Sequence, residues 1–455
     1  MKKILSFLII IFSVTVFAQE HFSAITTSQR VGLTNASINP SELTNLNSRF
    51  EVHILSFSTT ISNNKISFGD IIGEKDLEKL IFSGNEAVNF SVDAEIMGPG
   101  FGMKFMDWGF AFTTKSTLKA TIIDIDPTLG EAVSNSSSNV LIINSAVNNR
   151  YNQRANATAW GEIGLSAARK IFEDDKHQIN GGITFKLLFP GSYANIGLNQ
   201  INGTIRNTGA NLYLNNVSNA NLNFTYSGSL ADNFNNSSTF SKSVFGNLRG
   251  LGTDIGFNYK LKGVIQEYKV KVGASIRNIG SMSFKGEDNV SKNYSLNIND
   301  SSPVNAGLNL DQFKDVESIK DVEKILLNSN GRNGVQFTAT TDTKDLKVKL
   351  PTVFNFYADV NVIPKFSITA FLQQRLNDNN DNDQITALNS LSLTPRFTIS
   401  LFEVFSPLSF NENAGTLSGL GFRLGGFFMG SNSAFSAIAG GKQGDFYMGY
   451  RYGFL

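Results

Sequence analysis

The residue types that most often carry out catalysis are scarce in this chain. Its histidines are His21, His53 and His177, and it contains no cysteine, which excludes thiol nucleophiles, disulfides and thiolate metal sites. The sequence has no Gly-x-Ser-x-Gly elbow, no His-Glu-x-x-His pair and no Walker loop. The stretch GPGFG at Gly98–Gly102 predicts a tight turn, because no helix pattern follows it. We therefore expect no enzyme, no catalytic residues and no cofactor; only His53 is a remote candidate for a general base.

One stretch has the oxygen density of a cation site. Asn377–Gln384, NDNNDNDQ, carries three aspartates, and carboxylate and amide oxygens are the ligands that calcium prefers. The stretch lacks the glycine and the closing glutamate of a known calcium loop. A solvated outer loop is the simpler interpretation, so we expect no metal site.

The first residues predict export from the cytoplasm. Residues 1–18 combine two lysines, an apolar run and small residues ahead of Gln19, which is the pattern of a signal peptide. The alternative, a membrane anchor, is disfavoured because the run is shorter than the roughly 18 residues that a spanning helix needs. The net charge of +1 gives no reason to expect a nucleic-acid partner.

Alternation of apolar and polar residues runs through much of the remaining chain. In 179–189, apolar side chains fall on one face, and Asn180, Thr184 and Lys186 fall on the other. The same alternation recurs in 251–261, 268–277, 354–362 and 391–401. Segments of about ten residues are long enough to cross a bilayer as tilted strands.

These patterns predict an all-β fold, a transmembrane antiparallel β-barrel of about 14 strands. A short N-terminal hatch and helices in the outer loops complete the predicted fold. A soluble exported β-protein remains the alternative, but its strands would be shorter, near 5–6 residues. Nothing divides the chain into domains, since its nine prolines and 40 glycines are scattered.

The end of the chain carries a wholly apolar strand face. Its members alternate with small or polar residues and are Phe446, Met448, Tyr450, Tyr452 and Phe454. We expect this face to contact outer-membrane lipid, with the two tyrosines in an interfacial aromatic girdle. Such strong alternation should also help the barrel assembly machinery to recognise the strand.

Short turns are expected at the periplasmic end and long loops outside, which fixes strand directions. Twelve strands can be placed directly, among them 388–402 running inward and 417–429 running outward. An inserted hairpin between Gly191 and Arg249, in the Asn-rich stretch 211–226, would give fourteen. The apolar stretch 434–440 is then a short helix or turn in the last outer loop.

Three outer loops show helical spacing. They are 73–82, 126–150 and 311–328, and the last places Phe313, Val316, Ile319, Val322 and Leu326 on one stripe. We expect these helices to cap the rim. Gating a ligand path or docking a partner is the alternative.

The polar strand faces carry charges that we expect to form ion pairs across the lumen. Their basic excess could instead favour anions. The residues are Lys186, Asp254, Lys260, Lys269, Lys271, Arg277, Asp359, Arg375 and Arg396.

The segment before the first strand, GLTNASINPSELTNLNSRFEVHILSFS, places Asn39 and Pro40 where they could cap and open a short helix. Together with EIMGPGFGMKF and the ending GDFYMGYRYGFL, it resembles a family of Gram-negative outer-membrane barrels of unknown function. More distantly, the Asn-Pro turn is similar to the FadL/TodX-type transporters of hydrophobic compounds. That resemblance implies a hatch over residues 19–48, a barrel over 49–455 and a lateral opening that releases apolar ligands. The familiar motif continues with alanine, whereas Ser41 stands here.

Two functions remain open for a monomeric barrel in the Gram-negative outer membrane. The first is passage or uptake of a small apolar or amphipathic solute, as in the FadL-like transporters. The second is a structural or partner-binding barrel for surface secretion or attachment, without a conducting path. A gap in the wall beside an apolar pocket would favour the first. A lumen sealed by ion pairs and the hatch, with large ordered outer loops, would favour the second.

Overall fold

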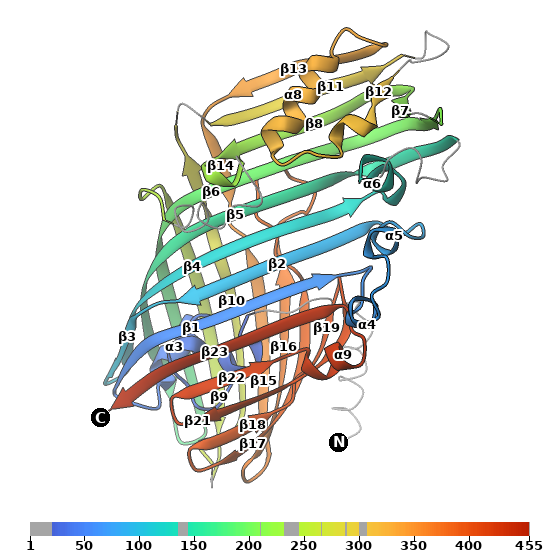
Figure 1. Ribbon diagram of the computed structural model, residues 1–455. Coiled ribbons are helices and arrows are strands. Elements are labelled where there is room, and N and C mark those ends of the chain that lie inside the picture. Colours follow the sequence, from blue (N-terminus) through green and yellow to red (C-terminus); the bar gives the residue numbers. More distant parts are fainter. Residues whose placement is uncertain are drawn as a thin grey trace.

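The computed structural model describes residues 21–134, 144–209, 211–231, 245–264, 266–286, 289–299 and 307–454. The predicted signal peptide, residues 1–18, lies outside these ranges. One antiparallel sheet closes on itself and forms a barrel with an extension beyond one end (Figure 1). No helix in the described ranges is long and apolar enough to cross a bilayer.

Fourteen strands form the closed wall, as predicted, and four of them are interrupted. β23 pairs with β1 from Phe454↔Phe50 to Gln443↔Ser62 and closes the ring. The wall segments are β1 (Phe50–Asn63), β2 (Val88–Met97) with β3 (Gly100–Phe105), β4 (Trp108–Ile125), β5 (Asn144–Glu173), β6 (His177–Asn207), β9 (Gly250–Lys262), β10 (Tyr268–Phe284), β14 (Leu346–Lys349) with β15 (Val353–Ile363), β16 (Phe366–Arg375), β17 (Ser390–Ile399), β18 (Phe402–Phe405) with β19 (Leu408–Asn411), β20 (Gly415–Ser418) with β21 (Leu420–Leu424), β22 (Phe427–Ser431) and β23 (Gln443–Phe454).

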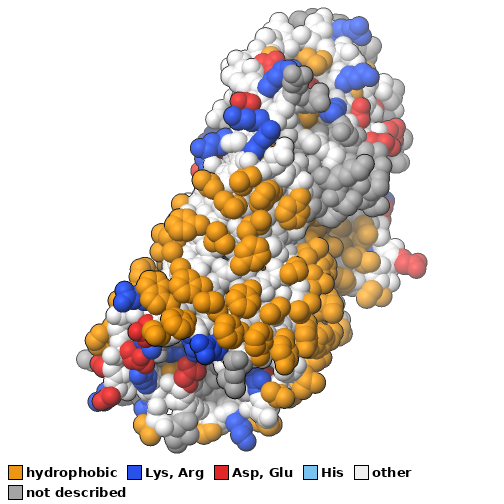
Figure 2. Space-filling model, turned by 90° about the vertical axis from the view of Figure 1, so that its left-hand side faces the viewer, with side chains coloured by type: hydrophobic (Ala, Val, Ile, Leu, Met, Phe, Trp, Pro, Cys, Tyr) orange, Lys and Arg blue, Asp and Glu red, His pale blue; other side chains and the backbone are white. Residues whose placement is uncertain are grey.

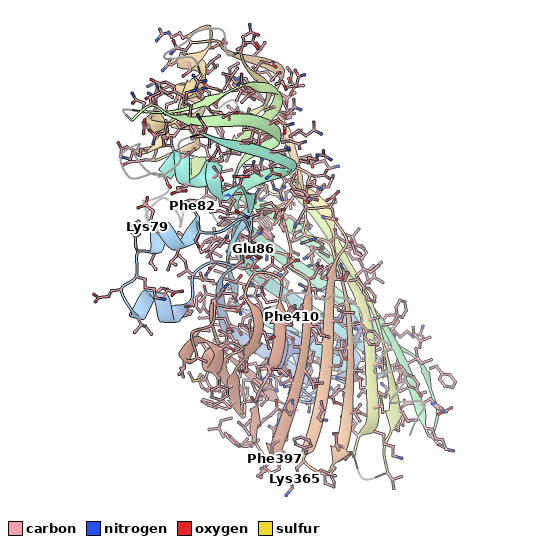
Figure 3. All side chains as sticks on the ribbon, turned by 90° about the vertical axis from the view of Figure 1, so that its right-hand side faces the viewer. Lys79, Phe82, Glu86, Lys365, Phe397 and Phe410 are labelled. Atoms are coloured by element: carbon pink, nitrogen blue, oxygen red, sulfur yellow. The ribbon has the colours of Figure 1, made fainter. Side chains whose placement is uncertain are left out.

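The period-2 pattern sets which side chains face the lumen. On β16, Ser367, Thr369 and Phe371 are buried inside, whereas Ile368 and Ala370 are partly exposed outside. Short turns join the strands at one end, where Figure 3 labels Lys365 and Phe397. Because the ring is closed, every wall strand has two neighbours and none presents a free edge within the barrel.

The total of fourteen is confirmed, but the thirteenth and fourteenth strands come from a different part of the chain. The hairpin β18/β19–β20/β21 supplies them, so the prediction of one outward strand over 417–429 is wrong. That range contains an inward strand, a turn at Gly425 (φ 59°) and an outward strand. The alternation of apolar and polar residues is hard to recognise there, because Pro407 interrupts the strand and leaves only short segments on either side.

The stretch GPGFG is not a turn, which corrects the sequence interpretation. β2 and β3 both pair with β1 and with β4, so the chain runs straight through Gly98 and Pro99. The turn to β4 lies at Met106 and Asp107 instead.

The predicted hairpin between Gly191 and Arg249 lies outside the wall. β6 continues beyond the barrel and pairs there with further strands, which form an outer subdomain (top of Figure 1). Its segments are β7 (Leu212–Asn215), β8 (Val217–Ser227), η2 (Ser229–Ala231), β11 (Val290–Ile298), β12 (Leu308–Asn309), η3 (Leu310–Phe313), α8 (Ile319–Ser329) and β13 (Val335–Thr343).

This outer subdomain has its own hydrophobic core, in which α8 and α6 (Pro127–Ser134) cover one face of the sheet. α8 begins only at Ile319, not at Asp311 as the periodicity suggests, because Ser318 Oγ caps it by accepting from Asp321 N at 3.1 Å. Burial raises the pKa of Tyr294, whose hydroxyl donates to Glu323 on α8, so this donor stays protonated.

Residues 21–48 lie inside the ring as α2 (Ser23–Thr26), α3 (Leu33–Ala36) and η1 (Pro40–Asn45), and we call this segment the hatch. Small helices at the outer end are α4 (Phe68–Ile72), α5 (Leu77–Ile81) and α9 (Ala434–Ile438). α5 and α9 confirm two predicted loop helices. In the predicted range 126–150, α6 and the start of β5 are observed, and residues 135–143 lie outside the described ranges.

Candidate functional site: the plugged lumen

The Asn39-Pro40 turn opens η1 inside the ring. Asn39 Oδ1 accepts from Ser41 N at 3.1 Å, and Pro40 occupies the first helical position. Asn39 Nδ2 donates to the backbone oxygen of Phe257 at 2.9 Å, which ties the turn to the wall. A Cβ at Gly256 would lie 2.1 Å from Asn39 Oδ1, so only glycine permits this close approach.

Ser41 gives the turn a second polar link to the wall. Its Oγ donates to Asn39 Oδ1 at 2.7 Å and accepts from Asn258 Nδ2 at 2.7 Å. Alanine, which the resemblance leads one to expect here, would lose both bonds. Serine in place of the alanine of the familiar motif therefore adds a hydrogen bond between the hatch and β9.

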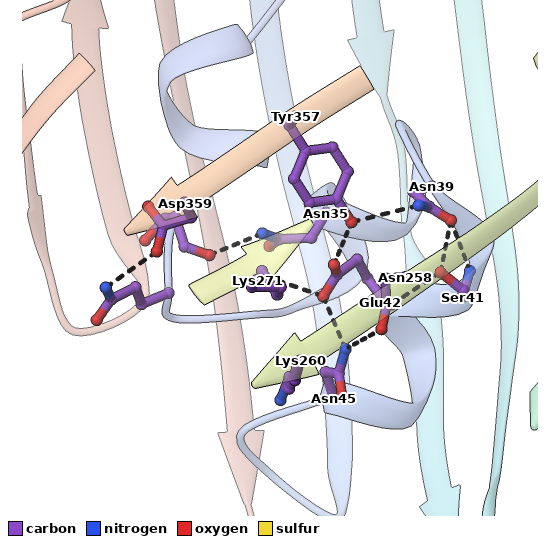
Figure 4. Close-up of polar contacts among 12 residues, drawn as sticks. Asn35, Asn39, Ser41, Glu42, Asn45, Asn258, Lys260, Lys271, Tyr357 and Asp359 are labelled. Atoms are coloured by element: carbon purple, nitrogen blue, oxygen red, sulfur yellow. Dashed lines mark hydrogen bonds and ion pairs between the residues drawn. The ribbon is translucent and has the colours of Figure 1, made fainter. Parts of the chain in front are cut away.

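Glu42 is the charged centre of the hatch (Figure 4). Its Oε2 lies 3.2 Å from Lys271 Nζ and accepts from Asn45 Nδ2 at 3.1 Å, and its Oε1 accepts from the Tyr357 hydroxyl. Glu42 and Lys271 are 2% and 1% exposed. Both charges are thus removed from water and are satisfied only by each other and by their polar neighbours.

Two glutamates of the wall, Glu51 on β1 and Glu403 on β18, bind other parts of the hatch. Glu51 Oε1 accepts from Leu33 N at 2.8 Å, while its Oε2 lies 2.5 Å from Arg451 Nη1. Glu403 accepts from Ser28 Oγ at 2.9 Å. Together with the pair of Glu42 and Lys271 on β10, these buried charge-assisted hydrogen bonds attach the hatch to widely separated strands of the ring.

A long loop closes the other end of the lumen. Residues 376–389 connect β16 to β17 and bend back toward β5 and β6. Tyr193 donates to the Asn382 backbone oxygen at 2.6 Å, and Asn152 Nδ2 donates to the Asn380 backbone oxygen at 2.8 Å. Arg154 Nη2 donates to Thr386 Oγ1 at 2.7 Å. We call residues 376–389 the inner loop.

Two of the three aspartates of Asn377–Gln384 pair with a lysine of the barrel wall. Lys349 Nζ lies 3.0 Å from Asp381 and 3.5 Å from Asp383. Among the described residues, no group of three or more His, Asp or Glu side chains is placed to hold a metal ion. The geometry thus gives calcium binding no support.

Little space is left between the hatch and the inner loop. The cavity where they meet has a volume of about 40 Å³ and is lined by His21, Asp93, Lys119 and Ala387. A vestibule of about 190 Å³ opens beyond it, with Asp124 and other polar residues on its walls.

The predicted lumen charges are mostly paired, although several partners come from the hatch and loops instead of the opposite wall. Lys269 is the exception, because a bulge between Tyr268 and Val270 turns it to the outside. Tyr268, placed on the lipid face by the alternation, points inward and donates to Asp359 at 2.8 Å. The other contacts are Lys186 with Asp254 and Glu162, Lys260 with Glu267, Arg277 with Ser37 O and Gln373, Arg375 with Glu412, and Arg396 with Glu403.

The aromatic face of the last strand lies on the outside of the barrel. Tyr447, with the opposite parity, is fully buried inside. On the face of the barrel that Figure 2 shows, apolar side chains form a belt, with charged residues beyond each edge. The exposed fractions of the outward side chains on the last strand are Phe446 37%, Met448 41%, Tyr450 44%, Tyr452 57% and Phe454 41%.

The three histidines have structural contacts. His21 Nε2 lies 2.8 Å from Asp93, His53 Nε2 lies 2.9 Å from Ser56 Oγ, and His177 pairs with Tyr259. His21 Nδ1 also lies 2.8 Å from Ser58 Oγ, so this buried histidine joins a serine hydroxyl to the carboxylate of Asp93, which pairs with Lys119 as well. The serine lies at Nδ1 and the aspartate at Nε2, which is the reverse of the ring orientation in a hydrolytic triad.

Comparison with known proteins places the chain in a family. The sequence pattern of a family of unknown function, DUF5723, matches residues 42–432, as the resemblance of the sequence implied. No curated protein matches the chain.

Solved structures show distant likenesses. They include a TodX monoaromatic hydrocarbon channel mutant (9% identity, 93% of each chain, TM-score 0.44) and the Ralstonia pickettii toluene transporter TbuX (9%, 98% of this chain and 100% of that one, TM-score 0.42). The Pseudomonas putida toluene transporter TodX is 8% identical over 96% of this chain and 98% of its own, with a TM-score of 0.40. At such scores these likenesses have no bearing on what this chain does.

Proposed function

The chain belongs to the DUF5723 family, and we propose that it is a transmembrane barrel of the Gram-negative outer membrane. In a closed antiparallel ring, the backbone N–H and C=O groups of each strand can bond to the neighbouring strands, which is what a bilayer requires of a spanning structure without helices. The apolar belt of Figure 2 supports this location. Short turns at one end and long loops at the other are typical of such barrels, and they orient the outer subdomain toward the outside.

We further propose that the barrel acts as a closed, partner-binding or structural anchor for its outer subdomain. One observation carries this proposal: the lumen is filled from both ends, by the hatch and by the inner loop, which leave a cavity of about 40 Å³ between them. The subdomain supports the same function, since it has a core of its own and projects beyond the rim.

Conductance across a planar bilayer tests the closed barrel. We expect the purified wild-type protein to insert without stable conductance steps. A variant that lacks residues 21–46, and in which residues 377–388 of the inner loop are replaced by a short glycine-serine linker, should conduct. Both proteins should run as compact species until boiled, which shows that each barrel is folded. Steady conductance by the wild-type protein would contradict a closed lumen.

A second candidate is passage of a small apolar or amphipathic solute, and one feature of the wall favours it. β1 pairs with β2 up to Ser56↔Met97 and with β3 from His53↔Gly100, so the wall is unpaired between these points. Leu33 of the hatch lies near Gly100 at this level, in an apolar cluster with three further hatch residues.

Replacement of Gly98 and Pro99 by residues that can pair, as serine and valine, tests this second candidate. If the interruption lets an apolar solute leave, uptake of a labelled aromatic hydrocarbon into whole cells should fall in the variant while barrel amounts stay equal. Equal uptake by cells with the wild type, the variant or no barrel would exclude it.

A further inference from the structure

An apolar groove of about 430 Å³ lies on the outer face of the wall, across β3 to β6. Ala167 forms its floor, and its sides include Phe101, Phe110, Phe112 and Phe185. The hollow follows from strand register. Ala167 stands between Phe110 on β4 and Ile183 on β6, so a methyl group occupies a place between two large side chains.

One positively charged side chain, that of Arg169, lies at the end of this groove nearer the short turns. Arg169 is the next outward residue below Ala167 on β5, and it pairs with Trp108 on one side and Gly181 on the other. Its guanidinium carbon lies 5.1 Å from the centre of the Trp108 ring. Gly181 has no side chain to contact Arg169, and the space above this glycine is taken by Ile171 and Phe257.

Arg169 differs from its neighbour Lys170 in its partners. Lys170 Nζ lies 3.2 Å from Asp107 and 2.5 Å from Glu173. Across the described ranges, no carboxylate lies within ion-pair distance of Arg169. An arginine that is oriented by an aromatic ring and lacks an internal anion is available to an external one.

We propose that this groove binds one phospholipid of the leaflet at the short-turn end, with an acyl chain over Ala167 and the phosphate on Arg169. The inference rests on the outer-membrane location proposed above. Tryptophan prefers the headgroup level of a bilayer, which fits Trp108 beside the phosphate. Guanidinium binds phosphate oxygens through two parallel hydrogen bonds, which an apolar solute or a hydrocarbon could not use.

Native mass spectrometry of the full-length barrel, released from detergent after delipidation and titrated with phosphatidylglycerol, tests the site. We expect the wild type to take up one lipid ahead of weaker general binding. Ala167→Phe fills the groove and Arg169→Gln removes the phosphate contact, so each should lower the occupancy of that first lipid about tenfold. Ala370→Phe, at an outward alanine on β16, and Lys365→Gln, at a distant turn, are matched controls and should bind as the wild type does.

Equal first-lipid occupancy in the wild type and in either groove variant would overturn the site while leaving the barrel intact. A dimer in the spectra that is lost in Ala167→Phe would also overturn it, because a second copy would then cover the groove. Heat modifiability separates failure of the lipid site from failure of the membrane location. If the wild-type protein shows no shift on boiling and is found in the soluble fraction, both the lipid site and the outer-membrane location are excluded.

Discussion

Glu42 shows how a single buried residue fixes the hatch. Its carboxylate is the partner of Lys271 at 3.2 Å and also accepts from Tyr357 and Asn45. Removing one member of a buried ion pair leaves the other charge desolvated and uncompensated, which costs about 3–5 kcal/mol. The effect should exceed that of any exposed pair in the chain.

Glu42→Gln keeps the volume of the side chain and removes its charge. We therefore expect the free energy of unfolding in denaturant to fall by about 3–5 kcal/mol, with heat modifiability lost at a lower temperature. Adding Lys271→Met should restore much of the loss, because the uncompensated ammonium is then gone.

Asp381→Asn is the matched control for that change. Asp381 pairs with Lys349 at 3.0 Å, but the two side chains are 48% and 49% exposed. Solvent screening limits such a pair to about 0–1 kcal/mol. A Glu42→Gln barrel as stable as Asp381→Asn would contradict the role of Glu42 in the hatch.

At the scale of elements, a row of amide side chains joins the barrel to the outer subdomain. The row crosses five strands, and its hydrogen bonds are 3.5, 2.9, 2.9 and 2.7 Å long. Its members are Asn156 (β5), Asn195 (β6), Asn223 (β8), Asn293 (β11) and Thr341 (β13). Because the strand register aligns them, each amide donates to the next strand.

Asn223→Ala should interrupt this row at its centre. Asn223 is 7% exposed, accepts from Asn195 and Thr225, and donates to Asn293. Two of these partners, Asn195 and Thr225, are buried, and the loss of their hydrogen bonds to Asn223 costs about 1–3 kcal/mol. We expect backbone amides of β8 and β11 to exchange hydrogen faster by about tenfold, and those of β16 to keep their protection.

Asn221→Ala provides the comparison on the same strand and face. Asn221 is exposed, so its loss should change stability by less than about 0.5 kcal/mol. Similar exchange rates in the Asn221 and Asn223 variants would show that the row adds nothing to the subdomain.

For the whole molecule, the proposed orientation can be measured directly because the chain has no cysteine. Thr338→Cys places a thiol on the exposed β13 of the outer subdomain, and Val264→Cys places one at a fully exposed short turn. We expect a membrane-impermeant maleimide to label Thr338→Cys on intact cells, and to label Val264→Cys only after the outer membrane is opened. The reverse labelling pattern would show that the barrel has the opposite orientation in the membrane.

Much of the wall could be predicted from sequence because alternation is local. Each outward residue of β23 is identified by its neighbours two positions away, and no distant contact is needed. The bulge at Tyr268 could not be predicted, since it arises from pairing with β9, and it moved Lys269 from the lumen to the outside. The hairpin at 402–424 was missed for a related reason: its four- and five-residue segments are too short for a clear period.

The sequence alone therefore determined the barrel class, the apolar face of the last strand and the segment that precedes the first strand, whereas the total of fourteen strands rested on a hairpin that lies outside the wall. These properties depend on patterns within a few residues. Only the tertiary structure decided that the lumen is closed, because the contacts that close it join residues far apart in the chain, such as Glu42 with Lys271 and Tyr193 with Asn382. It also decided which strands lie side by side, and so where Ala167 leaves a groove and Arg169 stands beneath it.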